Sequence, residues 1–308
     1  KWFPGDFIVE SFPGQFRNWF YSLLALSTVM EDRAPFKTLL VHGLVKDETG
    51  RDMHNSWGNT IWFDDAAEEI GVDVMRWMYA NQNIENNLLF GYGPANEVRR
   101  KLITLWNVYS FFATYAAVDG FSPNKSNINK GDLTILDRWI LAKTNLLIQQ
   151  AVSAFDLYRV DKFIRQFEQY LDDLSNWYIR RSRRRFWKSE DDADKQAAYH
   201  TLYHVLLTSI KIIAPILPFM TEEIYQNLAR NTDKSSQESI HLSDYPKIDK
   251  AEIDLKLIQR VDTLRKIVEL GRSARNKAEL KIRQPLAELC FHLDDNELVE
   301  FILEIGRA

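Results

Sequence analysis

The chain has 308 residues, enough for two domains, and with 45% hydrophobic and 27% charged residues it has the composition of a globular protein rather than a disordered one. A formal net charge of −4 excludes a global positive field that would attract nucleic acid, so any such contact needs a local basic patch. The single cysteine, Cys290, excludes an intrachain disulfide and a cysteine zinc cluster, and it fits a reducing cytoplasm, where we expect the protein.

The longest apolar run and the first residues give no sign of membrane insertion or export. Residues 210–220 are interrupted by Lys211, Pro215 and Pro218, and they are fewer than the roughly 18 residues that a membrane span needs. The chain starts without Met and without a signal-peptide pattern. We therefore expect no membrane partner, and we interpret the missing Met as the mark of a piece of a larger protein.

The first region, residues 1 to about 75, mixes short apolar runs with Gly and Pro. Residues 19–30 predict a helix, and residues 36–43 predict a buried strand that ends at a glycine. Residues 46–50 predict a polar turn. This alternation of helix and strand predicts the edge of an α/β sheet with loops at the carboxyl ends of its strands.

In the second region, residues 76 to 245, apolar side chains recur every three or four positions. The predicted helices are 102–115, 136–155, 160–178 with an arginine-rich continuation, and 199–213. A short helix is predicted to start at Thr221, because Thr caps helices and the two acids after it suit a helix N-terminus. Long helices with short connections predict an antiparallel bundle.

The third region, residues 246–308, follows a polar linker at residues 231–238. A long charged helix is predicted over residues 253–277, and residues 282–293 predict the start of an incomplete α/β module. The predicted fold class is therefore mainly α, with a partial α/β part followed by an antiparallel helical bundle.

The loop from Gly50 to Asn59 is the first candidate site. Its composition alone also allows a plain surface turn. It resembles the second signature loop of class I aminoacyl-tRNA synthetases, Lys-Met-Ser-Lys-Ser followed by Leu-Gly-Asn. The matching residues are Gly50 and Arg51 of the lead-in, and Met53, Ser56, Gly58 and Asn59. The resemblance implies that residues 1–75 are the C-terminal part of a Rossmann-type catalytic domain.

The resemblance also assigns a role to this loop. In the family, its lysines stabilise the charge that develops on pyrophosphate when an amino-acid carboxylate attacks the α-phosphate of ATP. Asp52 and Asn55 stand at the two lysine positions, so we expect Asp52 to repel the triphosphate and Asn55 to keep hydrogen bonding without the cation. The implied catalytic residues are Asp52, Met53, His54, Asn55 and Ser56, and Asn55 is also an implied ATP ligand.

Residues 13–20 form the second candidate site. They resemble the Asp-Gln-x-Arg-Gly-Trp-Phe motif that lies under the adenylate in isoleucyl and valyl enzymes, which implies that Gln15 contacts the aminoacyl-adenylate. His42 and Gly43 correspond to a His-Gly pair beside the nucleotide, although a lone His is also a common structural hydrogen-bonding group. We expect Trp19 and Phe20 to be core residues.

Five arginines lie among aromatic residues in the stretch 175–187, on one predicted helix. Such a stretch is either a solvated basic face or a surface that binds phosphates and stacks on bases. The string resembles a hallmark of isoleucyl-tRNA synthetases and implies binding of the anticodon arm of tRNA. The candidate tRNA-binding residues are Arg180, Arg181, Arg184, Arg185 and Trp187.

Three further strings, residues 214–225, 272–277 and 281–286, resemble the isoleucyl form in the same order. The first class I signature, His-x-Gly-His, does not occur in the chain. The resemblance therefore implies a fragment of a monomeric isoleucine–tRNA ligase that uses L-isoleucine, ATP with Mg and tRNA(Ile), holds no resident metal or tight cofactor, and is inactive as this chain alone. The alternative is a synthetase-like paralogue that binds tRNA without ligating it.

Overall fold

The structure is a computed structural model that describes residues 3–123, 130–188, 192–281, 283–288, 290–292, 298–299 and 301–302. The elements of the first part are β1 (Gly5–Ser11), α1 (Phe12–Gln15), α2 (Trp19–Glu31), β2 (Phe36–His42), β3 (Val45–Asp47), the 3₁₀ turn η1 (Asn55–Trp57), α3 (Phe63–Glu69), α4 (Val72–Asn81) and β4 (Leu88–Phe90). The longer helices that follow are α5 (Tyr92–Asp119), α6 (Ile135–Asp156), α7 (Val160–Asp172), the π-helical segment η3 (Asp173–Ile179), α8 (Arg180–Trp187), α9 (Ala193–Ile213), α10 (Pro218–Tyr225), the π-helical segment η4 (Gln226–Arg230) and α11 (Leu255–Lys277).

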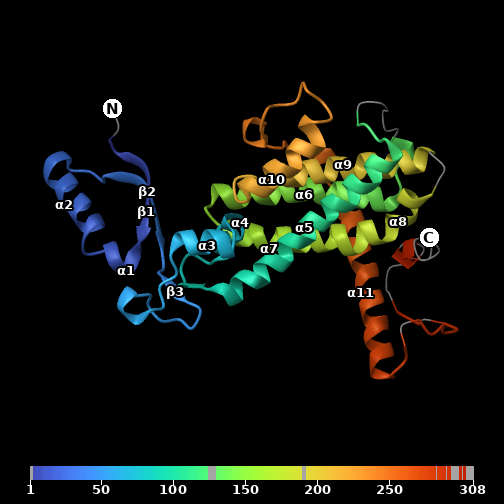
Figure 1. The fold of residues 1–308 in the computed structure, drawn as a ribbon, viewed down its shortest axis with the longest axis horizontal. Helices are drawn as coiled ribbons and strands as arrows, with labels where there is room; N and C mark the ends of the chain where they lie inside the picture. Colours follow the sequence, from blue (N-terminus) through green and yellow to red (C-terminus); the bar gives the residue numbers. More distant parts are fainter. Residues whose placement is uncertain are drawn as a thin grey trace.

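The first part is a small α/β unit at one end of an elongated molecule (Figure 1). β1 and β2 pair in parallel, with Gly5 opposite Phe36 and Ser11 opposite His42. β3 and β4 form a second parallel pair. The predicted helix at residues 19–30 and the predicted strand at residues 36–43 are confirmed as α2 and β2.

Two burial predictions for this unit are wrong. β2 is not a buried strand: its residues are half-buried or exposed, and Leu39 is 37% exposed. Among the described residues only β1 pairs with β2, so the other edge of β2 has no neighbouring strand. In the first turn of α2, only one side of the helix packs against other residues. Phe20 lies on that side and is buried, whereas Trp19 is exposed.

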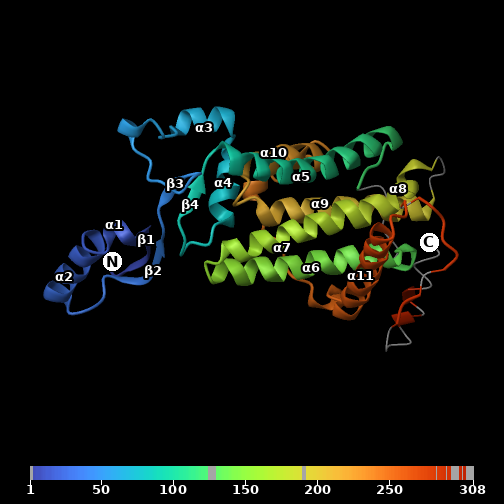
Figure 2. The same cartoon turned by 90° about the horizontal axis from the view of Figure 1, so that it is seen from below.

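The second part confirms the predicted antiparallel bundle. Its long helices α5, α6, α7 and α9 lie side by side along the molecule (Figure 1, Figure 2). α7, η3 and α8 form one continuous helical run, which confirms that the predicted third helix extends into arginine-rich sequence. Large aromatic side chains fill the interior and exclude water from it. Those that are almost fully buried are Trp77, Trp139, Tyr178, Tyr199, Phe163, Phe167 and Phe186.

Side-chain caps explain where several helices begin. At the start of α6, Thr134 and Asp137 each accept from the other's backbone N–H, a reciprocal capping box. α10 begins at Pro218 and not at Thr221, whose hydroxyl donates to the Leu217 carbonyl inside the helix. Its cap comes from α4, since the carboxylate of Asp73 accepts from the Met220 N–H at 2.6 Å. The predicted start of α10 is therefore wrong.

The long helix predicted over residues 253–277 is confirmed as α11, which leaves the bundle at an angle (Figure 1). Of the module predicted at residues 282–293, residues 282, 289 and 293 lie outside the described residues, and the rest are turn or irregular. Nowhere in the described ranges is a helix both long enough and apolar enough to traverse a bilayer.

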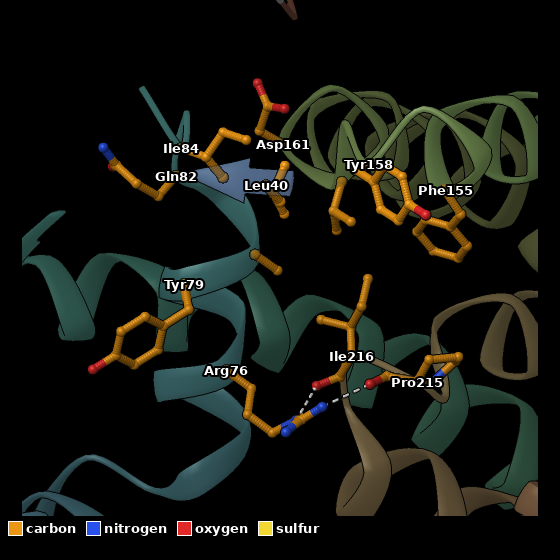
Figure 3. A pocket seen from close by; sticks show the side chains of 12 residues that line it. Leu40, Arg76, Tyr79, Gln82, Ile84, Phe155, Tyr158, Asp161, Pro215 and Ile216 are labelled. Carbon is orange, nitrogen blue, oxygen red and sulfur yellow. Dashed lines mark hydrogen bonds between the residues drawn. The ribbon is translucent and has the colours of Figure 1, made fainter. Parts of the chain in front are cut away.

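A hollow of ≈ 590 Å³ lies where the α/β unit meets the bundle (Figure 3). At its edge, the Arg76 guanidinium donates to the carbonyls of Ile216 and Pro215 at 2.9 and 2.7 Å. These bonds tie α4 to the turn between α9 and α10. α4 thus connects the two parts of the molecule.

Candidate functional site

The loop after β3 is closed by a network around Asp47. Its carboxylate accepts from the N–H groups of Thr49 and Arg51 and from the Asn59 amide, which lies 2.8 Å away. These hydrogen bonds, first of all those from Asn59 and Thr49, hold the pKa of Asp47 well below its usual range. The amide of Asn59 also donates to the Asp52 carbonyl and accepts from the His54 N–H. Asn59 therefore fixes both ends of the segment that carries the candidate catalytic residues.

Asp52 is ion-paired at the first of the two lysine positions. The Lys46 ammonium, on β3, lies 3.0 Å from its carboxylate. Lys46 is half-buried and Asp52 is exposed, so solvent screens the pair in part. The pair neutralises the carboxylate that we expected to repel a triphosphate. Lys46 was not among the predicted site residues, because residues 46–50 were predicted as a polar turn, whereas Val45–Asp47 form β3.

The tip of the loop presents its polar groups to solvent. Asn55 begins the 3₁₀ turn η1, and the Gly58 N–H closes this turn on the Asn55 carbonyl at 3.2 Å. Gly58 has φ 71°, a left-handed conformation that favours glycine. The rings of His54 and Trp57 pack edge to face. The side chains of Asn55 and Ser56 are exposed, and that of Met53 is half-buried.

The other candidate adenylate residues gather at the carboxyl edge of the β1–β2 pair. Ser11, the last residue of β1, lies opposite His42, and α1 follows β1 directly, so Gln15 belongs to the same edge. The side-chain oxygen of Gln15 accepts from the Trp19 N–H at 3.4 Å, at the start of α2. His42 Nδ1 lies 2.7 Å from the Gly43 carbonyl, which makes Nδ1 the donor.

Two glycines allow close approaches of neighbouring atoms, Gly43 after β2 and Gly91 after β4. A Cβ on Gly43 would lie 2.5 Å from the Asn86 carbonyl oxygen, so only glycine fits there. A Cβ on Gly91 would lie 2.6 Å from a carboxylate oxygen of Glu48, which accepts from the Gly93 N–H at the start of α5. Glu48 thus caps the first bundle helix and anchors the loop to it.

The exposed face of α8 carries most of the basic candidates. Arg180, Arg181, Arg184 and Trp187 are all exposed. The Arg181 guanidinium lies 4.6 Å from the centre of the Trp177 ring, a cation–π contact. Trp187 remains available for stacking. The guanidinium groups of Arg180, Arg181 and Arg184 form no ion pair with any residue in the described ranges.

Arg185 is placed differently from its neighbours. Its guanidinium donates to the fully buried carboxylate of Asp137 at 2.8 Å and to Asp194 at 2.7 Å. Burial alone would raise the pKa of Asp137, but the hydrogen bond and charge of Arg185 outweigh it and lower this pKa. The Tyr178 hydroxyl donates to the same carboxylate. Arg185 therefore supports the bundle core, and it is not free to bind a ligand in this conformation.

No group of three or more His, Cys, Asp or Glu side chains in the described ranges is arranged to hold a metal ion. The polar groups at the loop tip are an amide, a hydroxyl and an imidazole. Such groups can hydrogen-bond to phosphate oxygens.

Two family models match the chain. Residues 1–90 match tRNA synthetases class I (I, L, M and V), and residues 137–290 match the anticodon-binding domain of tRNA ligase. The second match covers half of the 308 residues. This chain belongs to the class I tRNA synthetases. The signature loop lies within the first of these matches, and the basic helix α8 lies within the second.

Several curated relatives of this class I chain are isoleucine–tRNA ligases. It is 44% identical to that of Dehalococcoides mccartyi strain CBDB1 over 289 residues, which are 93% of this chain and 28% of the relative. It is 39% identical to that of Methanothrix thermoacetophila over 311 residues, covering 100% of this chain and 29% of the relative. The chain thus spans less than a third of the length of these relatives.

Solved synthetase structures share the fold. The ternary complex of Agrobacterium radiobacter K84 agnB2 LeuRS with tRNA and LeuAMS aligns with a TM-score of 0.63 at 16% identity, over 82% of this chain and 29% of that one. Methionyl-tRNA synthetase from Mycobacterium tuberculosis, in complex with methionyl-adenylate, aligns with a TM-score of 0.61 at 19% identity, over 78% of this chain and 48% of that one. Identities this low support the fold alone.

Proposed function

We propose that this chain is the part of an isoleucine–tRNA ligase that supplies the second signature loop and the tRNA-binding helices. The whole protein would activate L-isoleucine with ATP and Mg and transfer it to tRNA(Ile), as a cytoplasmic monomer. The observation that carries the proposal is the exposed basic face of α8, which lies inside the segment that matches the anticodon-binding model. Arg180, Arg181 and Arg184 would bind phosphates and Trp187 would stack on a base.

We place the end of the catalytic part after Phe90 rather than at residue 75. β4 ends at Phe90 and pairs with β3, and the catalytic family model also ends at residue 90. The bundle then runs to about residue 245, and residues 246–308 contain α11.

The loop residues are proposed to act on the pyrophosphate of ATP. When the isoleucine carboxylate forms a bond to the α-phosphorus, the bond to pyrophosphate breaks and negative charge moves onto the leaving group. Asn55 and Ser56 at the exposed tip can donate hydrogen bonds to that charge. Lys46 keeps the carboxylate of Asp52 paired, which limits its repulsion of the triphosphate. Gln15, His42 and Gly43 would lie on the adenylate side.

The second candidate function is a paralogue that binds tRNA without charging it. The observation that favours it is the loop itself, where Asp52 and Asn55 leave both lysine positions without a cation. Isoleucine-dependent pyrophosphate exchange by a longer protein that includes this chain and a first signature separates the two functions. Exchange supports the ligase, and its absence together with tRNA binding supports the paralogue.

Binding of a tRNA(Ile) transcript tests the part of the proposal that both functions share. Affinity for the 308-residue chain should fall as salt rises, with a slope of roughly −0.7 to −0.9 per phosphate contact, because each contact releases counterions. Binding that is absent at low salt would reject both candidate functions. The same chain should show no isoleucine-dependent pyrophosphate exchange, since it lacks a first signature to hold the substrates in reacting geometry.

A further inference from the structure

A cleft of ≈ 450 Å³ lies between α8 and the side of α11. Arg180 and Arg181 line it from α8, and Arg272 lines it from α11. None of these three guanidinium groups forms an ion pair with a residue that the structure describes. Three cations that share a cleft repel one another, so their arrangement favours an anion between them.

The position of α11 is fixed by a buried ion-pair junction. Arg265 of α11 and Lys143 of α6 both pair with the carboxylate of Asp173, which is fully buried. The Arg265 guanidinium also lies 5.2 Å from the centre of the Trp177 ring. Because a buried carboxylate with two cationic partners resists separation, α11 is held at a set distance from α8. Arg272, two turns along α11 on the same face as Arg265, is thereby directed into the cleft.

The carboxylates at the cleft do not cancel its positive charge. Asp172 is engaged by the Asn176 amide at 2.5 Å and by Arg265 at 3.5 Å. Glu269 on α11 is the one remaining acid that lines the cleft, against Arg180, Arg181 and Arg272. Desolvation of the guanidinium, and after it the like charges of Arg272 and Arg180, lower the pKa of Arg181, so these two cations act on Arg181 in the cleft.

We propose that this cleft binds a phosphodiester of RNA, with Arg272 of α11 and Arg180 and Arg181 of α8 around one phosphate. The inference rests on the proposed tRNA-binding function and extends it from one helix to two. A guanidinium group donates two parallel hydrogen bonds to two oxygens of one phosphate, whereas a lysine ammonium acts as a point charge. A cleft lined by arginines therefore suits a phosphate. Arg180 and Arg184 lie four residues apart on α8, so the positive charge of the cleft continues along the exposed face of this helix.

Two changes on α11 test the cleft with opposite signs, in titrations of the 308-residue chain with a tRNA(Ile) transcript. Arg272→Gln should weaken binding about five- to tenfold and reduce the salt slope by about one contact. Glu269→Gln removes the only unpaired acid of the cleft and should tighten binding about two- to threefold. Lys266→Gln is the matched control, because Lys266 is exposed on the same helix, is not a residue of the cleft and carries the same charge as Arg272. It should change binding less than about twofold.

The outcomes separate the cleft from the wider proposal. If the unchanged chain binds the transcript and Arg272→Gln behaves like Lys266→Gln, the cleft is not an RNA site and only this inference fails. If the unchanged chain does not bind, the proposed function fails with it. A competition arm with inorganic phosphate at constant ionic strength identifies the source of the anion. Displacement of RNA by sub-millimolar phosphate would assign a free-phosphate site and overturn the RNA assignment.

Discussion

The α/β unit and the helical bundle bury their apolar side chains to different extents. In the bundle, Trp139 and Phe163 are fully buried, whereas in α2 of the α/β unit Val29 is 86% and Met30 76% exposed. The bundle therefore completes its own core, and the α/β unit leaves apolar surface uncovered by the described residues. The basic face of α8 therefore belongs to a unit that supports itself by its own core. The signature loop, in contrast, is held by its own hydrogen bonds around Asp47 and Asn59 rather than by a buried core.

The largest expected effect is on the bundle core. Arg185→Ala should lower the free energy of unfolding by about 3–5 kcal/mol, because it leaves the buried carboxylate of Asp137 without its charged partner. Urea denaturation followed by circular dichroism measures the loss. Arg184→Ala on the exposed face is the control and should change stability by less than about 0.5 kcal/mol. Equal effects of the two changes would contradict the assignment of Arg185 to the core.

The same pair predicts a pH dependence. The pKa of Asp137 is lowered in the folded chain, so its stabilisation is present above the unfolded value of about 3.9 and is lost as pH falls toward the folded value. In Arg185→Ala, burial without the guanidinium should raise this pKa instead. The stability difference between the two proteins should therefore shrink from pH 7 to pH 4. A constant difference over this range would show that the charge of Asp137 is not the cause.

A smaller effect is expected at the signature loop. In a longer protein that also contains a first signature, Asn55→Lys should raise the rate of adenylate formation about tenfold, roughly 1.4 kcal/mol of barrier, because it supplies the missing cation. Asp52→Lys should raise it less, since the new ammonium would lie beside Lys46. Single-turnover kinetics measure both. Unchanged rates in both variants would mean that another cation already holds the pyrophosphate.

The smallest effect is expected for an exposed pair of the α/β unit. Lys37→Ala removes an ion pair with Asp6 that bridges β1 and β2 at 2.6 Å, but both side chains are largely exposed. Solvent and salt screen such pairs, so the urea midpoint should not move measurably. A clear shift of the midpoint would mean that the open sheet depends on this contact more than the burial pattern indicates.

Much of the fold follows from local sequence. The three- to four-residue period of apolar side chains predicted α6, α9 and α11, and a short apolar run ending at glycine predicted β2. The start of α10 could not be predicted in this way, because its cap, Asp73, lies on α4, more than a hundred residues away in sequence. The openness of β2 also escaped prediction, since a strand sequence does not reveal how many neighbours will cover it.

The candidate site was predictable in location but not in detail. Resemblance and composition placed the basic residues on α8 and the polar residues on the loop after β3. The sequence did not indicate which arginine of α8 points toward the core. The π-helical segment η3 before α8 changes the number of residues per turn and so shifts the direction of the side chains that follow. The partners Asp137 of Arg185 and Asp173 of Arg265 are likewise far apart in sequence from the residues they bind.

The most direct measurement removes two arginines from the exposed face of α8 and follows tRNA binding. A tRNA(Ile) transcript is titrated against the unchanged 308-residue chain and against Arg181→Ala with Arg184→Ala, at several salt concentrations. We expect the double variant to keep its circular dichroism spectrum and to lose at least about tenfold in affinity, with a shallower salt dependence. Affinity and salt slope equal to those of the unchanged chain would show that the basic face of α8 is only solvated, and would contradict the proposed tRNA-binding function.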